Sequence, residues 1–381
     1  MGKNNNSHSS EKKKLGEVFR VFFKLGLLGF GGPAVHIALM EEEVVRKRNW
    51  MPQQQFLDLV GATNLIPGPN STEMTMHCGY ERAGTKGLVL AGACFILPAV
   101  CITGLIAWAY QQYGSLPQVQ PFIYGIKPAV LSIIAMAMLG LGKKAIKSVQ
   151  LAVIGLLSLL AVLIGFHEIL VFFAAGALGV LLYLVKKGTA LQGLFPLPFL
   201  QVSAAAMDGF NWQVFWVFLK VGAILYGSGY VLFAFLDAEL VATGLISRQT
   251  LVDAIAVGQF TPGPVFSAAT FIGWQLGGIG GAIAATIGIF LPSFLFVALL
   301  RPLLPLLQRS GSMRTFLDTV NVVAIAVIAA VLLEMSKESL ADWRTMLIGL
   351  VGISSSYFFP RLNSAFIVLG GALLGFVLYQ F

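Results

Sequence analysis

Charged residues are scarce in this chain of 381 residues: only 11% are Asp, Glu, Lys or Arg, whereas 57% are hydrophobic. An ordinary soluble domain contains about 25% charged residues. A water-soluble protein of this length could not cover its surface with so few charges, because the polar shell would be incomplete. The composition therefore excludes a soluble globular protein and predicts an integral membrane protein.

Motifs for disulfide, metal and nucleotide chemistry are also missing. Cys78, Cys94 and Cys101 lie in apolar stretches without a C-x-x-C pair, so we expect neither a disulfide framework nor a zinc site. The stretch 79–86 resembles a P-loop in its glycine spacing but lacks the Gly-Lys-Ser/Thr sequence that holds a phosphate. We therefore predict no cofactor, no metal and no enzymatic activity.

The formal net charge is +8. In a soluble protein such an excess could indicate nucleic-acid binding, but in a membrane protein it is typical of basic loops on the cytoplasmic side. We therefore expect contact with membrane lipid and none with nucleic acid. The polar start, residues 1–14, is not followed by a short apolar core with a cleavage site, so we expect no removable signal peptide.

Alternating strand patterns are rare, and a membrane β-barrel needs them. The apolar runs instead approach the ~20 residues that a helix needs to span a bilayer. The sequence therefore predicts an all-α polytopic membrane protein. Its apolar elements are expected at 18–40, 56–80, 88–110, 119–141, 149–166 and 168–185, and at 210–236, 250–276, 279–300, 313–335, 342–359 and 364–381.

Basic residues mark alternate loops. The loop 111–120 has no charge, whereas 142–148 contains three lysines and is therefore expected in the cytoplasm. In the second half, 277–280 is uncharged and 301–314 contains three arginines, which predicts that this half is inverted. We therefore expect a basic cytoplasmic tail at 1–17, a membrane repeat at 18–185, a linker that crosses the membrane at 186–209, and an inverted membrane repeat at 210–381.

Sequence similarity between the halves supports this repeat. Pro67-Gly68-Pro69 corresponds to Pro262-Gly263-Pro264, and Lys24 corresponds to Lys220 at nearly the same spacing. Further matches are Asp58 with Asp253, which we expect to brace the hairpins, and Pro98 with Pro292. Inverted repeats are typical of secondary transporters.

Each Pro-Gly-Pro segment predicts a helix break, because proline removes an amide donor and glycine permits a sharp reversal. The flanking arms 56–66 and 70–80 are too short to span, so we predict re-entrant hairpins whose half-helices direct free amides towards an anion. Kinks that serve only helix packing are the alternative, against which the neighbouring polar residues argue. The predicted substrate-binding residues are Lys24, Gly31, Gly32, Pro33, Asn64, Pro67, Gly68, Pro69, Asn70, Ser71, Thr72, Lys220, Gln259, Thr261, Pro262, Gly263, Pro264 and Ser267.

Ionisable residues in the apolar elements are further candidates. Lys24 and Lys220 are related by the repeat, and we expect them to supply countercharge for the anion; extension of both side chains to the membrane interface is the alternative. Glu73 and His77 lie four residues apart and share a helix face, which predicts proton coupling. A polar tether between two helices is the other reading of this pair.

Three stretches together resemble one known family. They are FGGPAVHIALMEEEVV, NLIPGPNSTEMTMHCGYERAGTKGLVLAGACFILPA and QFTPGPVFSAATFIGWQ, and they resemble the chromate ion transporter family in its long form with two fused halves. The family's Gly-Gly-Pro and Pro-Gly-Pro patterns fall on residues 31–33, 67–69 and 262–264. The second half departs from the first pattern, because it has Gly227-Ser228-Gly229.

The resemblance implies a secondary active exporter of chromate in the cell membrane that confers chromate resistance. Uptake of sulfate or another oxyanion, or exchange of chromate for sulfate, is the alternative. We expect a multi-pass protein with a cytoplasmic N-terminus, and the charges of residues 46–48 favour elements 18–40 and 56–80 that dip into the membrane over elements that cross it. A homodimer is one assembly that the sequence leaves open.

Overall fold

The computed structural model describes residues 3–30, 32–187, 210–226, 229–300, 310–359 and 362–380. Within these ranges the chain is helical and contains no strand. Five of the described helices are long and apolar enough to cross a membrane, namely Asn70–Tyr113, Gln120–Ala145, Glu168–Lys187, Val265–Leu299 and Gly311–Ser339. The predicted all-α class is therefore confirmed.

Among the described residues, the two halves contain equivalent elements in the same order, apart from the short turn η3, which occurs in the second half alone. The first half consists of α1 (Lys3–Leu28), α2 (Pro33–Met40), η1 (Glu41–Lys47), α3 (Gln53–Thr63), α4 (Asn70–Tyr113), α5 (Gln120–Ala145), α6 (Val149–Leu163) and α7 (Glu168–Lys187). The second consists of α8 (Phe210–Ile224), α9 (Val231–Leu236), η2 (Asp237–Val241), α10 (Arg248–Phe260), η3 (Val265–Ser267), α11 (Ala268–Leu300), α13 (Gly311–Ser339), α14 (Trp343–Phe358) and α15 (Ser364–Leu378). Most of the predicted linker, 188–209, lies outside the described residues.

The repeat extends to irregular details of the backbone. In α4 the helix is interrupted at Ala83 (φ −143°) and Gly84 (φ 62°), and in α11 it is interrupted at Gly277 (φ −149°) and Gly278 (φ 59°). The segments η1 and η2 are π-helical turns at equivalent places. Because such turns are rare and seldom recur by chance, the two halves share one fold.

The predicted helix breaks are present. The chain leaves α1 at Leu28 and starts α2 at Pro33, so the expected element 18–40 consists of two helices. It leaves α3 at Thr63 and starts α4 at Asn70, and α10 ends at Phe260 before the short turn η3. Pro33 occupies the first turn of α2, where a missing amide hydrogen costs nothing. That the helices on either side of each Pro-Gly-Pro segment form hairpins that re-enter the membrane stays a prediction.

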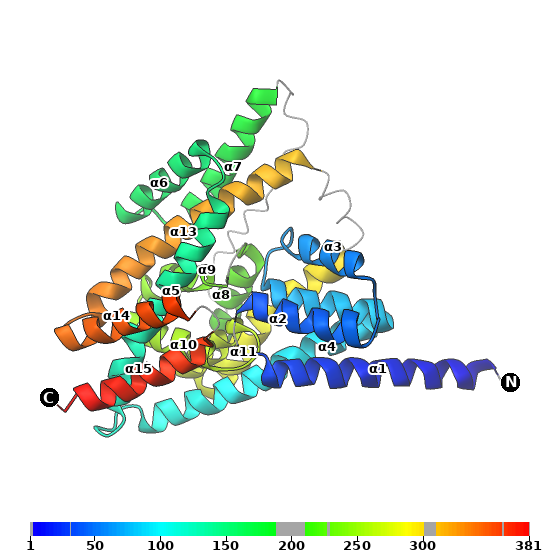
Figure 1. Ribbon diagram of the computed structural model, residues 1–381, viewed down its shortest axis with the longest axis horizontal. Helices are drawn as coiled ribbons and strands as arrows, with labels where there is room; N and C mark the ends of the chain where they lie inside the picture. Colours follow the sequence, from blue (N-terminus) through cyan, green and yellow to red (C-terminus); the bar gives the residue numbers. More distant parts are fainter. Residues whose placement is uncertain are drawn as a thin grey trace.

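The halves are interlocked instead of lying side by side. Within each half the first helix packs along the long helix that follows the break, α1 on α4 and α8 on α11 (Figure 1). The later helices exchange partners, because α5 packs on α14 and α15 of the second half, and α13 packs on α6 and α7 of the first. The later helices of each half therefore bury apolar surface against the other half.

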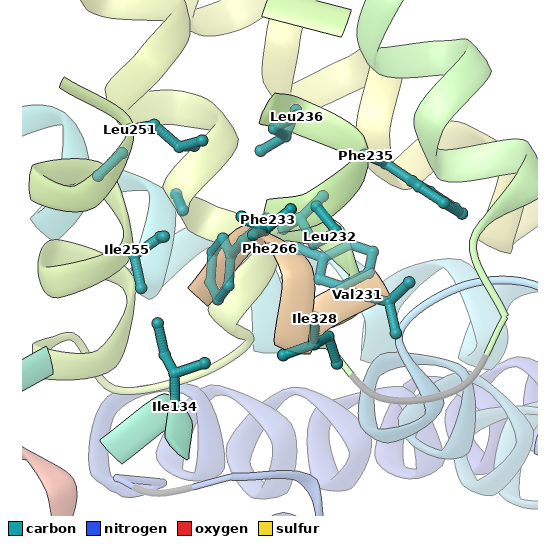
Figure 2. Close-up of a cluster of buried hydrophobic side chains, with 14 of the residues drawn as sticks. Ile134, Val231, Leu232, Phe233, Phe235, Leu236, Leu251, Ile255, Phe266 and Ile328 are labelled. Atoms are coloured by element: carbon teal, nitrogen blue, oxygen red, sulfur yellow. The ribbon is translucent and has the colours of Figure 1, made fainter. Parts of the chain in front are cut away.

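The largest hydrophobic cluster surrounds the short helix α9. Figure 2 shows its side chains among those of α5, α10, η3 and α13, and the labelled residues are Ile134, Val231, Leu232, Phe233, Phe235, Leu236, Leu251, Ile255, Phe266 and Ile328. All six residues of α9 are buried. Since α9 is hydrophobic on every side, it forms part of the core, and the second Pro-Gly-Pro segment is attached to a rigid interior.

Candidate functional site at the paired helix breaks

The first Pro-Gly-Pro segment is bound to the second half of the protein. Gly68 has φ 135°, a backbone conformation that residues with a side chain rarely adopt. Its amide donates a hydrogen bond of 2.7 Å to the carbonyl oxygen of Leu225, directly after the end of α8. We call this contact junction A.

The second segment is bound to the first half in the same way. Gly263 has φ 87°, and its amide donates a hydrogen bond of 2.9 Å to the carbonyl oxygen of Gly29, directly after the end of α1. We call this contact junction B. Because Gly29 and Leu225 are equivalent in the repeat, the two junctions are one arrangement built twice, with each break held by the opposite half.

Junction A contains polar side chains. Glu73 of α4 and Ser293 of α11 are both fully buried, and a Cβ atom at position 68 would overlap Glu73 Oε1 and Ser293 Oγ. Tyr226 directly follows Leu225, whose carbonyl oxygen is the acceptor at this junction. The first break is therefore packed against a carboxyl group from its own half and a hydroxyl group from the other.

Junction B contains mostly apolar side chains at the equivalent places. Ala268 stands where junction A has Glu73, and Ala99 stands where it has Ser293. A Cβ atom at position 263 would lie 2.9 Å from the Cβ atom of Ala99. One polar side chain is present, because His36 Nε2 lies 2.8 Å from the carbonyl oxygen of Gly29 and donates to it in the Nε2–H tautomer.

Both breaks are flanked by buried polar atoms that have no hydrogen-bond partner in the described protein. They include two groups that can donate, Thr72 Oγ1 in the first turn of α4 and Gln259 Nε2 near the end of α10. Thr72 is fully buried and Gln259 is 5% exposed. Since a buried hydroxyl or amide without a partner costs free energy, these atoms are candidate ligands for an anion between the breaks.

Other predicted site residues pair with each other across the breaks. Asn70 Nδ2 donates to Asn64 Oδ1 at 2.7 Å, which links the end of α3 to the start of α4. In the second half, the hydroxyl groups of Thr261 and Ser267 lie 3.4 Å apart. Ser71 is buried beside Thr72. Gly32 precedes α2 and Pro33 is its first residue, whereas Gly31 lies outside the described residues.

The two repeat-related lysines form ion pairs near the ends of α1 and α8, each four residues before its helix ends. Lys24 Nζ lies 3.1 Å from Glu43 Oε1, and Lys220 Nζ lies 2.6 Å from Glu239 Oε1. Of the two lysine side chains, 54% and 38% are exposed. No hydrogen bond or ion pair of the described residues joins either lysine to a Pro-Gly-Pro segment. Their role as countercharge for the anion stays a prediction.

Glu43 collects several positive partners. Burial alone would raise the pKa of its carboxyl group, but hydrogen bonds from Lys24 and Arg48, together with the charge of Arg48, bring that pKa below its ordinary value. Lys47 lies 3.5 Å from the same carboxylate. In the second half Glu239 accepts from Lys220, while Asp237 accepts from Arg248 at 3.1 Å. These pairs fix η1 and η2 to the neighbouring helices.

The predicted proton-coupling pair lies within α4. Glu73 and His77 are both fully buried, one helical turn apart. Among the described residues, no group of three His, Cys, Asp or Glu side chains could hold a metal ion. What the junctions bring together is therefore backbone dipoles, hydroxyl groups, an amide and one carboxyl group, a set that suits binding of an oxyanion together with a proton.

Comparison with known proteins places this arrangement in a family. The family described as "Chromate transporter" matches residues 16–180 and 212–376, which correspond to the two repeats. The chain belongs to the chromate transporter family. It is 30% identical to the chromate transport protein of Cupriavidus metallidurans, over 98% of this chain and 95% of that protein.

Two further relatives cover nearly the whole chain. A probable chromate transport protein of Synechococcus elongatus is 30% identical, over 98% of both chains. A chromate transport protein of Pseudomonas aeruginosa is 26% identical, over 95% of this chain and 92% of that protein. No solved structure matches the chain significantly. The resemblance noted from the motifs is thus confirmed over both halves.

Several residues of this chromate transporter family member were missed by sequence reasoning. Ser293 and Tyr226 join junction A from the second half, and His36 joins junction B from α2. None of them stands in a recurring motif, because Leu232 and Phe30 occupy the places equivalent to His36 and Tyr226. The position of His36 three residues after the Gly-Gly-Pro segment was the one available signal.

Proposed function

We propose that this protein is a secondary active exporter of chromate in the cell membrane, and that it confers chromate resistance. The family membership and the names of three relatives along nearly the full chain support transport of chromate. The observation that carries the proposal is the pair of equivalent helix breaks, each bound to the opposite half. Interlocked breaks between repeats are where secondary transporters hold ions and substrates.

The anion binds between the two Pro-Gly-Pro segments. Its oxygens accept hydrogen bonds from the first amides of α4, and from the donors of Thr72 and Gln259 that have no protein partner. The amide of Thr72 is the first of α4 to donate a hydrogen bond back to the carbonyl oxygen of Pro69. The amides of Asn70 and Ser71 precede it in the chain, so they are the first amides of α4 that face the proposed anion. Amides and hydroxyl groups recognise charge and tetrahedral shape, so sulfate competes for the same site.

Export follows from the membrane potential. The interior of the cell is negative, and moving two negative charges outward gains about 4.6 kcal/mol per 100 mV, since each charge contributes about 2.3 kcal/mol. This free energy supports a gradient on the order of a thousandfold. Uptake of the same dianion requires about three accompanying protons before net positive charge moves inward.

Proton exchange through Glu73 and His77 adds to this driving force. Glu73 touches the first break, and His77 lies one turn further along the same helix. In this exchange a proton enters the cell as the anion leaves. Glu73 carries that proton, so its carboxyl group alternates between the charged and the neutral form. The cytoplasmic N-terminus and the inverted second half follow from the positions of the basic loops.

The test is chromate flux in inverted membrane vesicles that contain the full-length protein. We expect accumulation of labelled chromate when potassium and valinomycin impose a potential that is positive inside the vesicle, and competition by sulfate. Flux that ignores the potential and follows only the pH gradient contradicts potential-driven export. Accumulation of sulfate in the opposite direction favours the uptake alternative.

Two variants locate the site within that assay. Pro69→Ala and Pro264→Ala are expected to lower transport at least tenfold while the protein stays in the membrane, because continuous helices no longer present their ends. Pro52→Ala is the control, since Pro52 is exposed and precedes α3 outside the breaks. Normal transport by both break variants contradicts the site.

A further inference from the structure

A second buried polar cluster lies apart from the two junctions. It consists of Tyr110 of α4, Lys127 of α5 and Asp253 of α10. The hydroxyl group of Tyr110 donates to Asp253 Oδ2 at 2.6 Å, and Lys127 Nζ lies 3.9 Å from Asp253 Oδ1. The Asp253 side chain is 5% exposed and that of Lys127 is 12% exposed. The cluster thus joins helices of both halves through groups that are costly to bury.

The ammonium group of Lys127 is attracted to Asp253 but is not hydrogen-bonded to it. A separation of 3.9 Å exceeds the 2.7–3.2 Å of an N–H···O hydrogen bond. An ammonium group has three donors, and within the described residues Asp253 is the one charged partner of this lysine. Lys24 and Lys220, by contrast, lie 3.1 and 2.6 Å from their glutamates. Lys127 therefore keeps donors that another oxygen-bearing ligand can use.

The cluster occurs once, although the fold occurs twice. Asp58 is equivalent to Asp253, but it is exposed and accepts a hydrogen bond from Gln54. Asn321 is equivalent to Lys127. The ion pairs that attach η1 and η2 recur in both halves because they maintain the common fold. The cluster of Tyr110, Lys127 and Asp253 is confined to one place, so maintenance of the common fold does not explain it.

The helices that carry the cluster connect it to both breaks. Asp253 lies on α10, which leads into the second Pro-Gly-Pro segment, and Tyr110 lies on α4, which starts at the first. Lys127 is followed by Pro128, which interrupts the hydrogen bonds of α5. A ligand that alters the contact between Lys127 and Asp253 therefore acts on a helix attached to each break.

We propose that Lys127 forms a second binding site for the transported oxyanion, in addition to the one between the Pro-Gly-Pro segments, and that the carboxylate of Asp253 is an internal substitute that faces Lys127 when no anion is bound. The identity of the anion rests on the proposed function. When an oxyanion occupies the donors of Lys127, an ionised Asp253 repels it, so Asp253 takes up a proton. Tyr110 acts as a positioning residue that holds the carboxyl group in reach of Lys127.

Anion binding at this cluster strengthens as the pH falls. Asp253 faces Lys127 from α5 and Tyr110 from α4, and the described parts of α9, η2, η3, α11, α13 and α15, which also pack on α10, add no titratable group that acts on it. In water a lysine or tyrosine side chain changes its charge only well above pH 8. Within the cluster, Asp253 is therefore the group whose charge changes as the solution becomes acidic.

The experiment measures anion binding to the full-length protein purified in detergent, with sulfate and chromate as probes at pH 5.5, 6.5 and 7.5. We expect Asp253→Asn to bind both anions about tenfold more tightly than the wild type at pH 7.5, and to lose the pH dependence of the affinity, within the usual range of coupling between two ligands. The matched control is Asp58→Asn, which changes the equivalent acid and is expected to behave as the wild type.

A second comparison tests Lys127 without leaving a buried charge alone. The double variant Lys127→Met/Asp253→Asn removes both charges, so it keeps a neutral interior and is expected to fold. It should bind the anions at least tenfold more weakly than Asp253→Asn, and Lys127→Arg should retain most of the affinity. Tyr110→Phe should change the pH profile of binding, because the carboxyl group loses the donor that fixes it.

Each outcome of these binding experiments supports or overturns one part of the proposal. Equal binding by Asp253→Asn and the wild type with the same pH dependence overturns the substitute role, and equal binding by the double variant and Asp253→Asn overturns the role of Lys127. Absence of anion binding in both the wild type and Asp253→Asn overturns the site altogether. Vesicle flux separates this result from the proposed function, because a protein that binds anions as expected but moves no chromate contradicts export alone.

Discussion

Junctions A and B share one backbone arrangement and differ in their side chains. In both, the glycine of a Pro-Gly-Pro segment has positive φ and donates its amide to the carbonyl that follows the first helix of the other half. Junction A places Glu73 and Ser293 against that glycine, whereas junction B places Ala99 against it and has Ala268 at the position equivalent to Glu73. Backbone and side chains have therefore diverged to different degrees.

The difference separates two requirements of a transporter. The glycine conformation and the hydrogen bond between the halves are needed twice, because each break must be held open inside an apolar protein where an unpaired amide is costly. A titratable carboxyl group, that of Glu73, lies against the first break, as the proposed exchange of one proton per cycle requires. Substitutions that make the side chains or the backbone of the two junctions alike can therefore test the backbone requirement and the carboxyl requirement separately.

The largest effect is expected when junction B receives the carboxyl group of junction A. Ala268→Glu buries a carboxylate in the mostly apolar junction B, where Ala99 stands in place of Ser293, and an unpaired buried charge costs about 3–5 kcal/mol. We expect the variant to accumulate poorly in the membrane and to show a lower thermal midpoint in detergent. Adding Ala99→Ser should recover part of the loss. A fully stable Ala268→Glu protein contradicts the apolar character of junction B.

The next effect concerns the shared backbone. Gly68→Ala and Gly263→Ala each force a side chain into a positive-φ conformation, at a cost of about 1–3 kcal/mol, and the new Cβ meets Glu73 in one and Ala99 in the other. Chromate transport should fall at least tenfold in both. Gly61→Ala is the control, because a Cβ there has no neighbour within 4 Å and α3 favours alanine. Loss in one variant alone shows that the junctions do not act as a pair.

A smaller effect is expected at the carboxyl group of junction A. Glu73→Gln keeps the shape of the side chain but cannot exchange a proton, so transport at one fixed pH should fall less than about tenfold, while its response to an imposed pH gradient disappears. Glu81→Gln, an acid further along α4 that accepts from Gln55, should leave that response intact. The measurement is chromate flux in vesicles at constant potential with varied pH, and a response retained by Glu73→Gln excludes this proton path.

The smallest effect compares the ion pairs of η1 and η2. Glu43 accepts from Lys24 and Arg48, whereas Glu239 accepts from Lys220 among the basic side chains, so Glu43→Gln should lower stability by about 1–2 kcal/mol and Glu239→Gln by less than about 1 kcal/mol. The pKa of the Glu43 carboxyl group is lowered in the folded protein. Its contribution to the free energy of unfolding is therefore present at neutral pH and is lost as the pH falls through this lowered pKa. Thermal midpoints between pH 4 and 7 check both statements, and equal losses contradict the difference.

Much of the fold follows from local sequence. Proline and glycine act on their immediate neighbours, so the breaks at 29–32, 64–69 and 261–264 could be predicted without knowledge of the rest of the structure. The repeat could be predicted because equivalent residues keep nearly constant spacing. The apolar runs gave most helices, although the chain divides the expected element 18–40 into α1 and α2.

What could not be predicted depends on contacts between distant residues. The amide of Gly68 pairs with Leu225, and nothing in the local sequence of either residue indicates the other. Lys24 was predicted as a countercharge from its apolar surroundings, but its contact with Glu43 arises because the chain turns back through α2 and η1. The cluster of Tyr110, Lys127 and Asp253 likewise requires the exchange of helices between the halves.

The interlocking hydrogen bonds also set an order of events during synthesis. When Gly68 leaves the ribosome, its acceptor Leu225 has not been made, and at about 5–20 residues per second it follows on the order of ten to thirty seconds later. Gly263, by contrast, finds the carbonyl of Gly29 already in the membrane. The first break therefore forms before its final acceptor exists, whereas the second closes onto a partner that is already made. A chain halted between the halves therefore lacks the acceptor of its first break, whereas a chain halted after the second break has both.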